Sequence, residues 1–154
     1  MLYEIEPNDI KDDASVVFLG DSITGVTTHI NDDDWYVFDA SAPGLLSVNL
    51  SSDVSHAFDY FNVIAYDADH TILSSRRGGG NSYYEDPLSF TVAAPTSGLY
   101  YIVVESSTAH TTDPYDLTVN FTEGSLTSFA EDYETESNNI APKDNPAFAD
   151  AIAF

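Results

Sequence analysis

The stretch Leu99-Tyr100-Tyr101-Ile102-Val103-Val104 decides the fold class. It consists of aromatic, β-branched and other large apolar residues, which favour strands, and the preceding Pro95-Thr96-Ser97-Gly98 is rich in turn-forming residues. Similar runs occur at residues 35–37, 45–50, 58–66, 88–92 and 117–121, and turn-rich pieces at 41–44, 67–70, 76–82 and 111–114. This spacing predicts an all-β fold, an antiparallel sandwich of seven to nine short strands.

Composition limits the classes of partner. The 154 residues suffice for one domain, and 43% apolar with 13% aromatic residues exclude a disordered chain. The formal net charge of −22 repels nucleic acids and anionic membranes, so neither is expected as a partner. No apolar run approaches the roughly 20 residues that cross a membrane. The charge suits a saline exterior, and we expect a secreted protein whose export signal lies outside this sequence.

The N-terminal segment is repeated near the end of the chain. Tyr3-Glu4-Ile5-Glu6-Pro7-Asn8-Asp9-Ile10 recurs as Tyr133-Glu134-Thr135-Glu136-Ser137-Asn138-Asn139-Ile140, with five of eight positions identical. Residues 13–18 also correspond loosely to residues 149–154. The repeat predicts a complete module at residues 1–122, a linker at 123–132, and the truncated start of a second copy at 133–154.

An acidic cluster at the N-terminus is the main candidate for a metal site. Glu4, Glu6, Asn8 and Asp9 lie within six residues, and Asn31-Asp32-Asp33-Asp34 forms a second acidic run. Cysteine is absent, so a metal must use oxygen or imidazole ligands, and dense carboxylate oxygens favour Ca²⁺ over Mg²⁺. The alternative is a solvated acidic surface. Because Glu-x-Glu-x-Asn recurs in the second copy, calcium binding is the preferred interpretation.

Other motifs indicate no catalytic site. Asp67-Ala68-Asp69 differs from an EF-hand loop because Ile72 stands where that loop needs Gly, so we interpret it as a hairpin turn. The four histidines show no helical metal-ligand spacing, and no Gly-x-Ser-x-Gly sequence is present. We therefore expect a protein that is not an enzyme.

Paired tyrosines are candidates for a binding surface. Alternation along a strand predicts that one member of Tyr83-Tyr84 and of Tyr100-Tyr101 is buried and the other faces solvent. Tyr84 and Tyr101 are the candidate exposed members, which can stack on sugar rings or pack on a fibrous protein. Ordinary cross-strand packing is the simpler alternative.

Several motifs together resemble the bacterial pre-peptidase C-terminal domain over residues 3–122. They are Glu4-Ile5-Glu6-Pro7-Asn8-Asp9, then Gly25 nine residues before Asp34-Trp35-Tyr36-Val37-Phe38, then Ser97-Gly98-Leu99-Tyr100-Tyr101-Ile102-Val103-Val104, and the closing Tyr115-Asp116-Leu117-Thr118-Val119. Members of this family are jelly-roll-like β-sandwiches appended to secreted proteases and other exported bacterial enzymes. The collagen-binding domains of clostridial collagenases are similar.

The resemblance implies a metal site. In the relatives, an N-terminal segment and the loop before the Asp-aromatic-Tyr strand share two calcium ions. The corresponding ligands in this sequence are Glu4, Glu6, Asn8, Asp9 and Asp34. A further loop carboxylate of the relatives falls on Asn31, one residue short of Asp32, so the first ion is better supported than the second. The collagen-contacting tyrosines fall near Glu105 and Ser107, which argues against collagen binding.

The sequence thus predicts a non-catalytic, calcium-binding accessory module of a secreted bacterial multidomain protein, such as an exported protease. Its expected roles are domain stabilisation, spacing or substrate targeting, and its expected partners are adjacent domains of the same chain. Two alternatives stay open. One is a module that binds an extracellular polysaccharide or insoluble protein through exposed tyrosines, and the other is a repeat unit of an adhesin.

Overall fold

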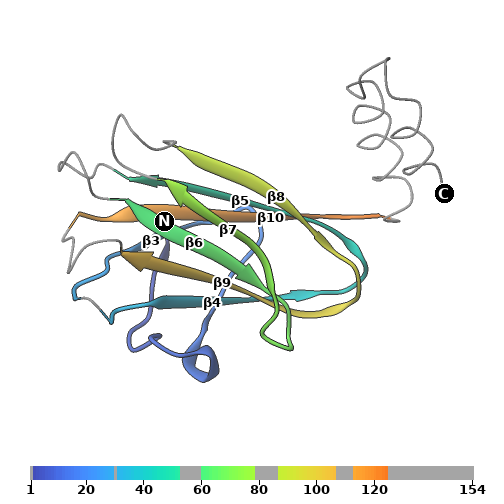
Figure 1. The fold of residues 1–154 in the computed structure, drawn as a ribbon, viewed down its shortest axis with the longest axis horizontal. Helices are drawn as coiled ribbons and strands as arrows, with labels where there is room; N and C mark the ends of the chain where they lie inside the picture. Colours follow the sequence, from blue (N-terminus) through green and yellow to red (C-terminus); the bar gives the residue numbers. More distant parts are fainter. Residues whose placement is uncertain (1, 30, 53–59, 79–86, 107–112, 125–154) are drawn as a thin grey trace, which may run out of the picture.

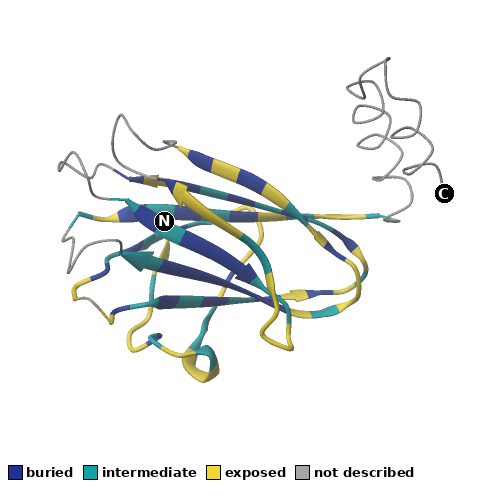
Figure 2. Ribbon diagram, viewed as in Figure 1, coloured by how far each residue is buried: buried dark blue, intermediate teal, exposed yellow. Residues whose placement is uncertain are grey.

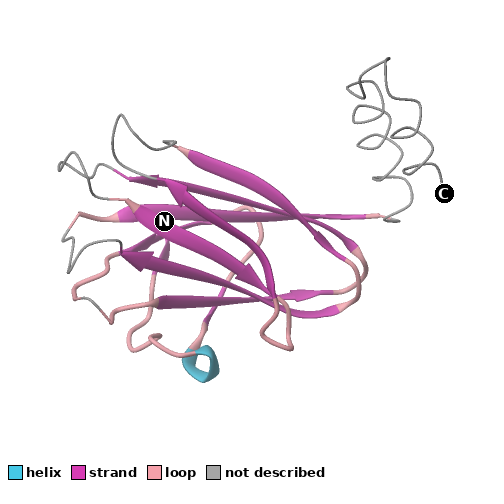
Figure 3. Ribbon diagram, viewed as in Figure 1, coloured by secondary structure: helices cyan, strands magenta, loops and turns pink. Residues whose placement is uncertain are grey.

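The computed structural model describes residues 2–29, 31–52, 60–78, 87–106 and 113–124, and within them ten strands form two five-stranded sheets. The two sheets pack face to face as a β-sandwich (Figures 1 and 3). The first has the order β1-β3-β10-β5-β8, formed by Leu2–Tyr3, Ser22–Gly25, Tyr115–Glu123, Gly44–Ser52 and Leu88–Ala94. The second has the order β2-β4-β9-β6-β7, formed by Ser15–Val16, Asp34–Ala40, Gly98–Ser106, Phe61–Tyr66 and Ile72–Gly78.

The all-β class and the sandwich architecture are confirmed, with two differences in detail. The ten strands exceed the expected seven to nine because β1 and β2 are two-residue edge strands with no alternation to detect. Both pair in parallel, with β3 and β4 respectively, whereas every longer pair is antiparallel. The N-terminal segment therefore runs along one side of the sandwich and adds a short strand to each sheet.

Strand β7 extends into residues that the sequence placed in a turn. Arg76 and Arg77 pair with Val63 and Asn62 of β6, and Gly78 pairs with Phe61, so residues 76–78 belong to a strand. Residues 79–82 lie outside the described residues. The β6–β7 hairpin turns at residues 67–70, as expected, where the amide of Asp67 donates to the carbonyl of Thr71 at 3.1 Å. The polar residues of this strand give no strand signal in the sequence, because backbone pairing with β6 sets its conformation more than side-chain propensity does.

The core lies between the sheets and is formed by the residues that are buried at alternate positions along the strands (Figure 2). Tyr36, Phe61 and Tyr115 are its largest fully buried side chains, together with Leu46 and Leu50 from β5. The centre of the second sheet is fixed by pairing of β4 with β9 from Asp34↔Val104 to Ala40↔Gly98. This register puts Asp34 on the core-facing side at the end of the sandwich, where the N-terminal segment passes.

Some predictions lie outside the described residues. They include Tyr84 and nearly all of the linker and second copy at residues 125–154. Strand β10 ends at Glu123, one residue beyond the predicted module, and the domain boundaries stay a prediction. Within the described ranges, no helix combines the length and the apolar character that a membrane crossing requires.

Candidate metal centre

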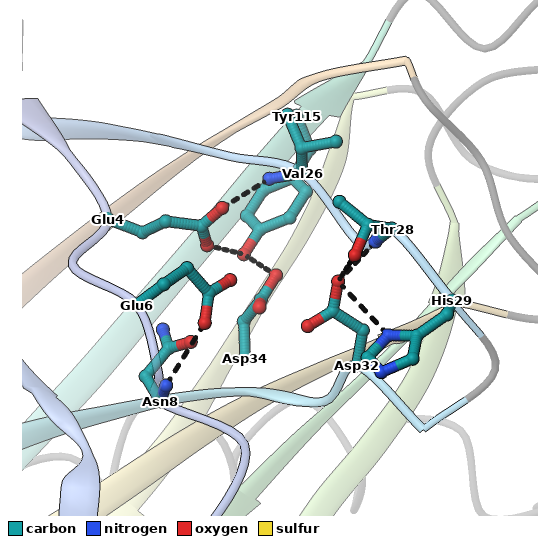
Figure 4. A network of polar contacts seen from close by, with 9 residues as sticks. All are labelled: Glu4, Glu6, Asn8, Val26, Thr28, His29, Asp32, Asp34 and Tyr115. Carbon is teal, nitrogen blue, oxygen red and sulfur yellow. Dashed lines mark hydrogen bonds and ion pairs between the residues drawn. The ribbon is translucent and has the colours of Figure 1, made fainter.

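Backbone pairing brings the N-terminal segment against the start of β4. The Glu4 amide donates to the carbonyl of Thr24 at 3.1 Å and so continues the pairing of β1 with β3. Further along the segment, the carbonyl of Asn8 accepts a hydrogen bond from the amide of Trp35 at 2.9 Å. These two anchors hold the intervening residues beside Asp34, with the side chain of Glu6 turned toward it (Figure 4).

Two groups of carboxylates result, and they share one member. In each group, one oxygen from every residue lies within 4.8 Å of the others: Glu4, Glu6 and Asp34 in the first, and Glu6, Asp9 and Asp32 in the second. Glu6 therefore stands between two candidate cation positions. Three of the five residues come from the N-terminal segment and two from the sandwich, so a cation here would join the two parts.

Two buried tyrosines complete the wall of the first group. The Tyr115 hydroxyl donates to Asp34 Oδ2 at 2.5 Å and lies 2.6 Å from the Tyr36 hydroxyl. Tyr36 in turn donates to Glu4 Oε2 at 3.1 Å, and the amide of Val26 donates to Glu4 Oε1 at 2.7 Å. These bonds fix the carboxylates of Glu4 and Asp34 in the orientation that faces Glu6 (Figure 4).

Gly25 makes room for this arrangement. A Cβ at this position would lie 2.7 Å from Glu4 Oε2 and closer still to the hydroxyl and ring of Tyr115. Real Cβ atoms essentially never approach other atoms within 3.0 Å, so any other residue would displace Glu4 or Tyr115. The backbone of β3 thus sets the position of a ligand carboxylate and of the tyrosine that orients Asp34.

Burial makes the first group electrostatically costly without a cation. Asp34 is fully buried, and burial is the main reason that its pKa is raised to about 9. The hydrogen bond from Tyr115 acts to lower this pKa, and the charge of Glu4 acts to raise it. Burial also raises the pKa of Glu4 and Glu6 above the usual range. In the absence of a cation, Asp34 therefore carries a proton at neutral pH, because several carboxylates in a desolvated space cannot all ionise.

The second group has a different electrostatic character. Asp32 is 4% exposed and accepts hydrogen bonds from the hydroxyl of Thr28 at 2.6 Å and from the Thr28 amide, with His29 Nδ1 at 3.6 Å. Burial acts to raise the pKa of Asp32, but the bonds from Thr28 outweigh it and the pKa lies below the usual range. Asn31 is exposed beside it, so the buried carboxylate of the loop is that of Asp32.

Unpartnered buried oxygens show that the donor set fits a hard cation. Among the described residues, Asn8 Oδ1, Asp9 Oδ1 and Asp34 Oδ1 are buried without a hydrogen-bond partner. A buried oxygen without a donor costs roughly 1–3 kcal/mol, which a coordinated cation would remove. Three unsatisfied oxygens beside clustered carboxylates match the six to eight oxygen ligands that Ca²⁺ takes in irregular geometry.

The structure brings together most of the predicted ligands. The two groups contain five of the predicted ligands, Glu4, Glu6, Asp9, Asp32 and Asp34. Asn8 lies beside them, and its backbone amide donates to Glu6 Oε2 at 3.2 Å. Tyr36 and Tyr115 were not predicted to take part. Alternation places Tyr36 on the same face of β4 as Asp34 and was the available signal, whereas Tyr115 arrives through the pairing of β10 with β3.

The expectation that Tyr101 faces solvent is wrong. Tyr100 and Tyr101 are both buried, at 3% and 8% exposed. Tyr100 belongs to the core, while the ring of Tyr101 lies under Lys11, whose Nζ is 4.7 Å from the ring centroid. The short helix at Lys11–Asp13, carried by the N-terminal segment, covers this part of the outer sheet surface.

Comparison with known proteins supports the fold alone. No protein-family model and no curated protein sequence matches the chain. Among solved structures, the pre-peptidase C-terminal domain of a collagenase from Bacillus anthracis matches with a TM-score of 0.52 and 15% identity. The match covers 70% of this chain and 94% of that domain. The chain has the fold of a pre-peptidase C-terminal domain. The order of the sequence motifs indicated this pre-peptidase C-terminal fold.

Proposed function

We propose that the chain is a non-catalytic accessory module in which Ca²⁺ fastens the N-terminal segment to the β-sandwich. The observation that carries the proposal is the set of unpartnered buried oxygens of Asn8, Asp9 and Asp34 between two carboxylate groups that share Glu6. Oxygen is the only donor type in these groups, which favours Ca²⁺ over softer metals.

Both parts of the fold would supply ligands to the cation. Glu4, Glu6, Asn8 and Asp9 would supply ligands from the segment, and Asp32 and Asp34 from the sandwich. A bound divalent cation would neutralise carboxylates that otherwise repel one another or hold protons. Tyr115 and the backbone amide of Val26 orient the oxygens beforehand, so the ligands need little rearrangement on binding.

The function of such a site is mechanical. Within residues 2–10, the segment is attached to the sandwich by the two-residue pairing of β1 with β3 and by single backbone bonds at Glu4 and Asn8, so a cation would add a further attachment between the two parts of the fold. Fixing the segment would stiffen the junction with whatever precedes the module and make the fold depend on calcium. This suits an accessory module of a secreted multidomain protein, because extracellular fluids contain abundant calcium whereas the cytosol does not.

Thermal unfolding tests this proposal. At a free Ca²⁺ concentration of a hundred times Kd, binding stabilises the folded state by about 2.7 kcal/mol, which raises Tm by roughly 10 °C for a module of this size. We expect this rise for the wild type relative to excess chelator, and its loss in Glu6→Gln. Asp39→Asn, which removes an exposed charge elsewhere on β4, is the matched control and should keep the full rise. Equal melting with calcium and with chelator would refute the proposal.

A further inference from the structure

The outer face of the second sheet carries an apolar cluster that is separate from the core. Ile64 and Val103 are buried but do not belong to the cluster between the sheets. Their register places them side by side in the row Trp35, Val103, Ile64 across β4, β9 and β6. Large side chains on this surface must therefore cover them.

Aromatic rings provide this cover. The rings of Trp35 and Tyr66 stack with centroids 5.6 Å apart and planes inclined by 15°. The imidazole of His70, from the β6–β7 turn, lies 4.6 Å from the Tyr66 ring and 5.4 Å from the Trp35 ring. Trp35 and Tyr66 are half-buried and His70 is exposed, so the cluster presents aromatic surface to solvent.

Two carboxylates border these rings. The antiparallel register of β4 with β9 brings Asp33, which precedes β4, level with Glu105 on β9. Asn62 donates to Glu105 Oε2 at 2.8 Å. Burial and then the charges of Glu105 and Asp33 raise the pKa of Tyr66, which shows that both carboxylates lie near its ring. Over the described residues, neither Asp33 nor Glu105 forms an ion pair.

The cations of the chain itself show what this surface accepts. Lys11 Nζ lies over the Tyr101 ring, next to Trp35, at 4.7 Å from the centroid, and the Arg77 guanidinium lies 5.4 Å from the Tyr60 ring. Both basic side chains therefore pack on tyrosine rings, one on β9 and the other just before β6. The side chains of Asp33 and Glu105 border this aromatic surface, and carboxylates beside aromatic rings attract a cation through both Coulombic and cation–π terms.

We propose that this aromatic–acidic face, formed by Asp33, Trp35, Tyr66, His70 and Glu105, docks an arginine-bearing basic segment of a partner protein. A guanidinium can stack on the exposed aromatic rings while it donates hydrogen bonds to the carboxylates of Asp33 and Glu105. Charge complementarity selects a basic partner, because the chain has a net charge of −22 and the two carboxylates of this face form no ion pair with another described residue. The face consists of side chains other than the proposed metal ligands, so it adds a target to the proposed calcium-fastened module.

Trp35 makes the test direct, because it is the one tryptophan of the chain. The fluorescence of the calcium-loaded protein is followed while the peptide Gly-Arg-Gly-Arg-Gly-Arg-Gly is added, with the neutral citrulline peptide as a matched probe. We expect saturable quenching by the arginine peptide, weakened by added salt, and at least fivefold weaker response to the citrulline peptide.

Variants place the interaction on this face. Glu105→Gln and Tyr66→Leu should each weaken binding of the arginine peptide at least fivefold, and melting confirms that each variant is folded. Asp39→Asn, an equal change of charge on an exposed residue of the same sheet, should change it less than twofold. No saturable quenching, equal binding of the citrulline peptide, or equal loss in Asp39→Asn would overturn the proposal. Saturable binding of a neutral oligosaccharide that survives Glu105→Gln and excludes the peptide would also overturn it.

Discussion

Replacing Gly25 by alanine tests whether the space beneath the metal ligands matters as the structure indicates. The new Cβ would lie 2.7 Å from Glu4 Oε2, about 0.7 Å inside the 3.4 Å at which ordinary contact begins, and nearer still to Tyr115. Both neighbours are confined, Tyr115 by full burial and Glu4 by the amide of Val26. Overpacking of this kind costs roughly 1–3 kcal/mol, because packed interiors have little room to yield.

The displaced groups belong to the metal site, so the cost should also appear in calcium affinity. If about 1.4 kcal/mol of the strain falls on the bound state, the affinity drops about tenfold. Isothermal titration of Ca²⁺ into Gly25→Ala measures the affinity, and chemical denaturation in excess chelator measures the loss of stability. We expect both quantities to fall.

Gly44→Ala is the matched control for this experiment. A Cβ at Gly44 would lie 2.6 Å from the ring of Phe121 and closer still to the carbonyl oxygen of Thr122, a steric conflict as close as that at Gly25 but without a metal ligand. We therefore expect Gly44→Ala to lose roughly 1–3 kcal/mol of stability and to bind calcium within about twofold of the wild type. Wild-type calcium affinity in Gly25→Ala, or an equal loss of affinity in both variants, would refute the reasoning.

Three further predictions concern the ligands themselves. Tyr115→Phe removes the donor to Asp34 and should destabilise the chelated protein by about 1–2 kcal/mol in denaturant titrations, with no loss if the bond is unimportant. The raised pKa of Asp34, about 9, means that its stabilising contribution is complete below its usual pKa near 3.9 and is lost as the pH rises through 9. Melts in chelator should therefore fall in Tm from pH 5 to pH 8.5, whereas the gain in Tm on adding calcium should grow over the same interval; a chelated Tm that rises would contradict this. Asp32→Asn should weaken calcium binding at least tenfold in titration calorimetry and Asn31→Ala less than threefold, because only Asp32 is buried with the other ligands; the reverse order would show that Asn31 is the loop ligand.

Much of the sandwich could be predicted because long strands carry their own signal. Residues 45–50 and 99–104 alternate or are densely apolar, and both lie within strands of nine residues. Strands β1 and β2 could not be found in this way, because two residues have no period and their conformation follows from pairing with β3 and β4. The end of β7 was missed for the same reason, since Arg76 and Arg77 are exposed and their strand conformation follows from backbone pairing with β6.

The metal site was predictable in its ligand types and less so in its supporting structure. The spacing of Glu4, Glu6 and Asn8 identified oxygen donors that the structure brings to one place. The contribution of Tyr115 depends on a contact between the two sheets, from β10 to the start of β4, at a sequence separation of 81 residues, and no local pattern contains it. The covered position of Tyr101 likewise depends on Lys11, which the N-terminal segment carries over the sheet.

Counting bound ions tests the central claim most directly. Native mass spectrometry of the chain in the presence of calcium, compared with Glu6→Gln, reports how many ions the folded protein holds. The shared position of Glu6 between two carboxylate groups predicts two calcium ions on the wild type and a marked loss of both in the variant, with Asp39→Asn unchanged. A wild-type protein that takes up no more calcium than Glu6→Gln would contradict the account and leave the acidic cluster as solvated surface.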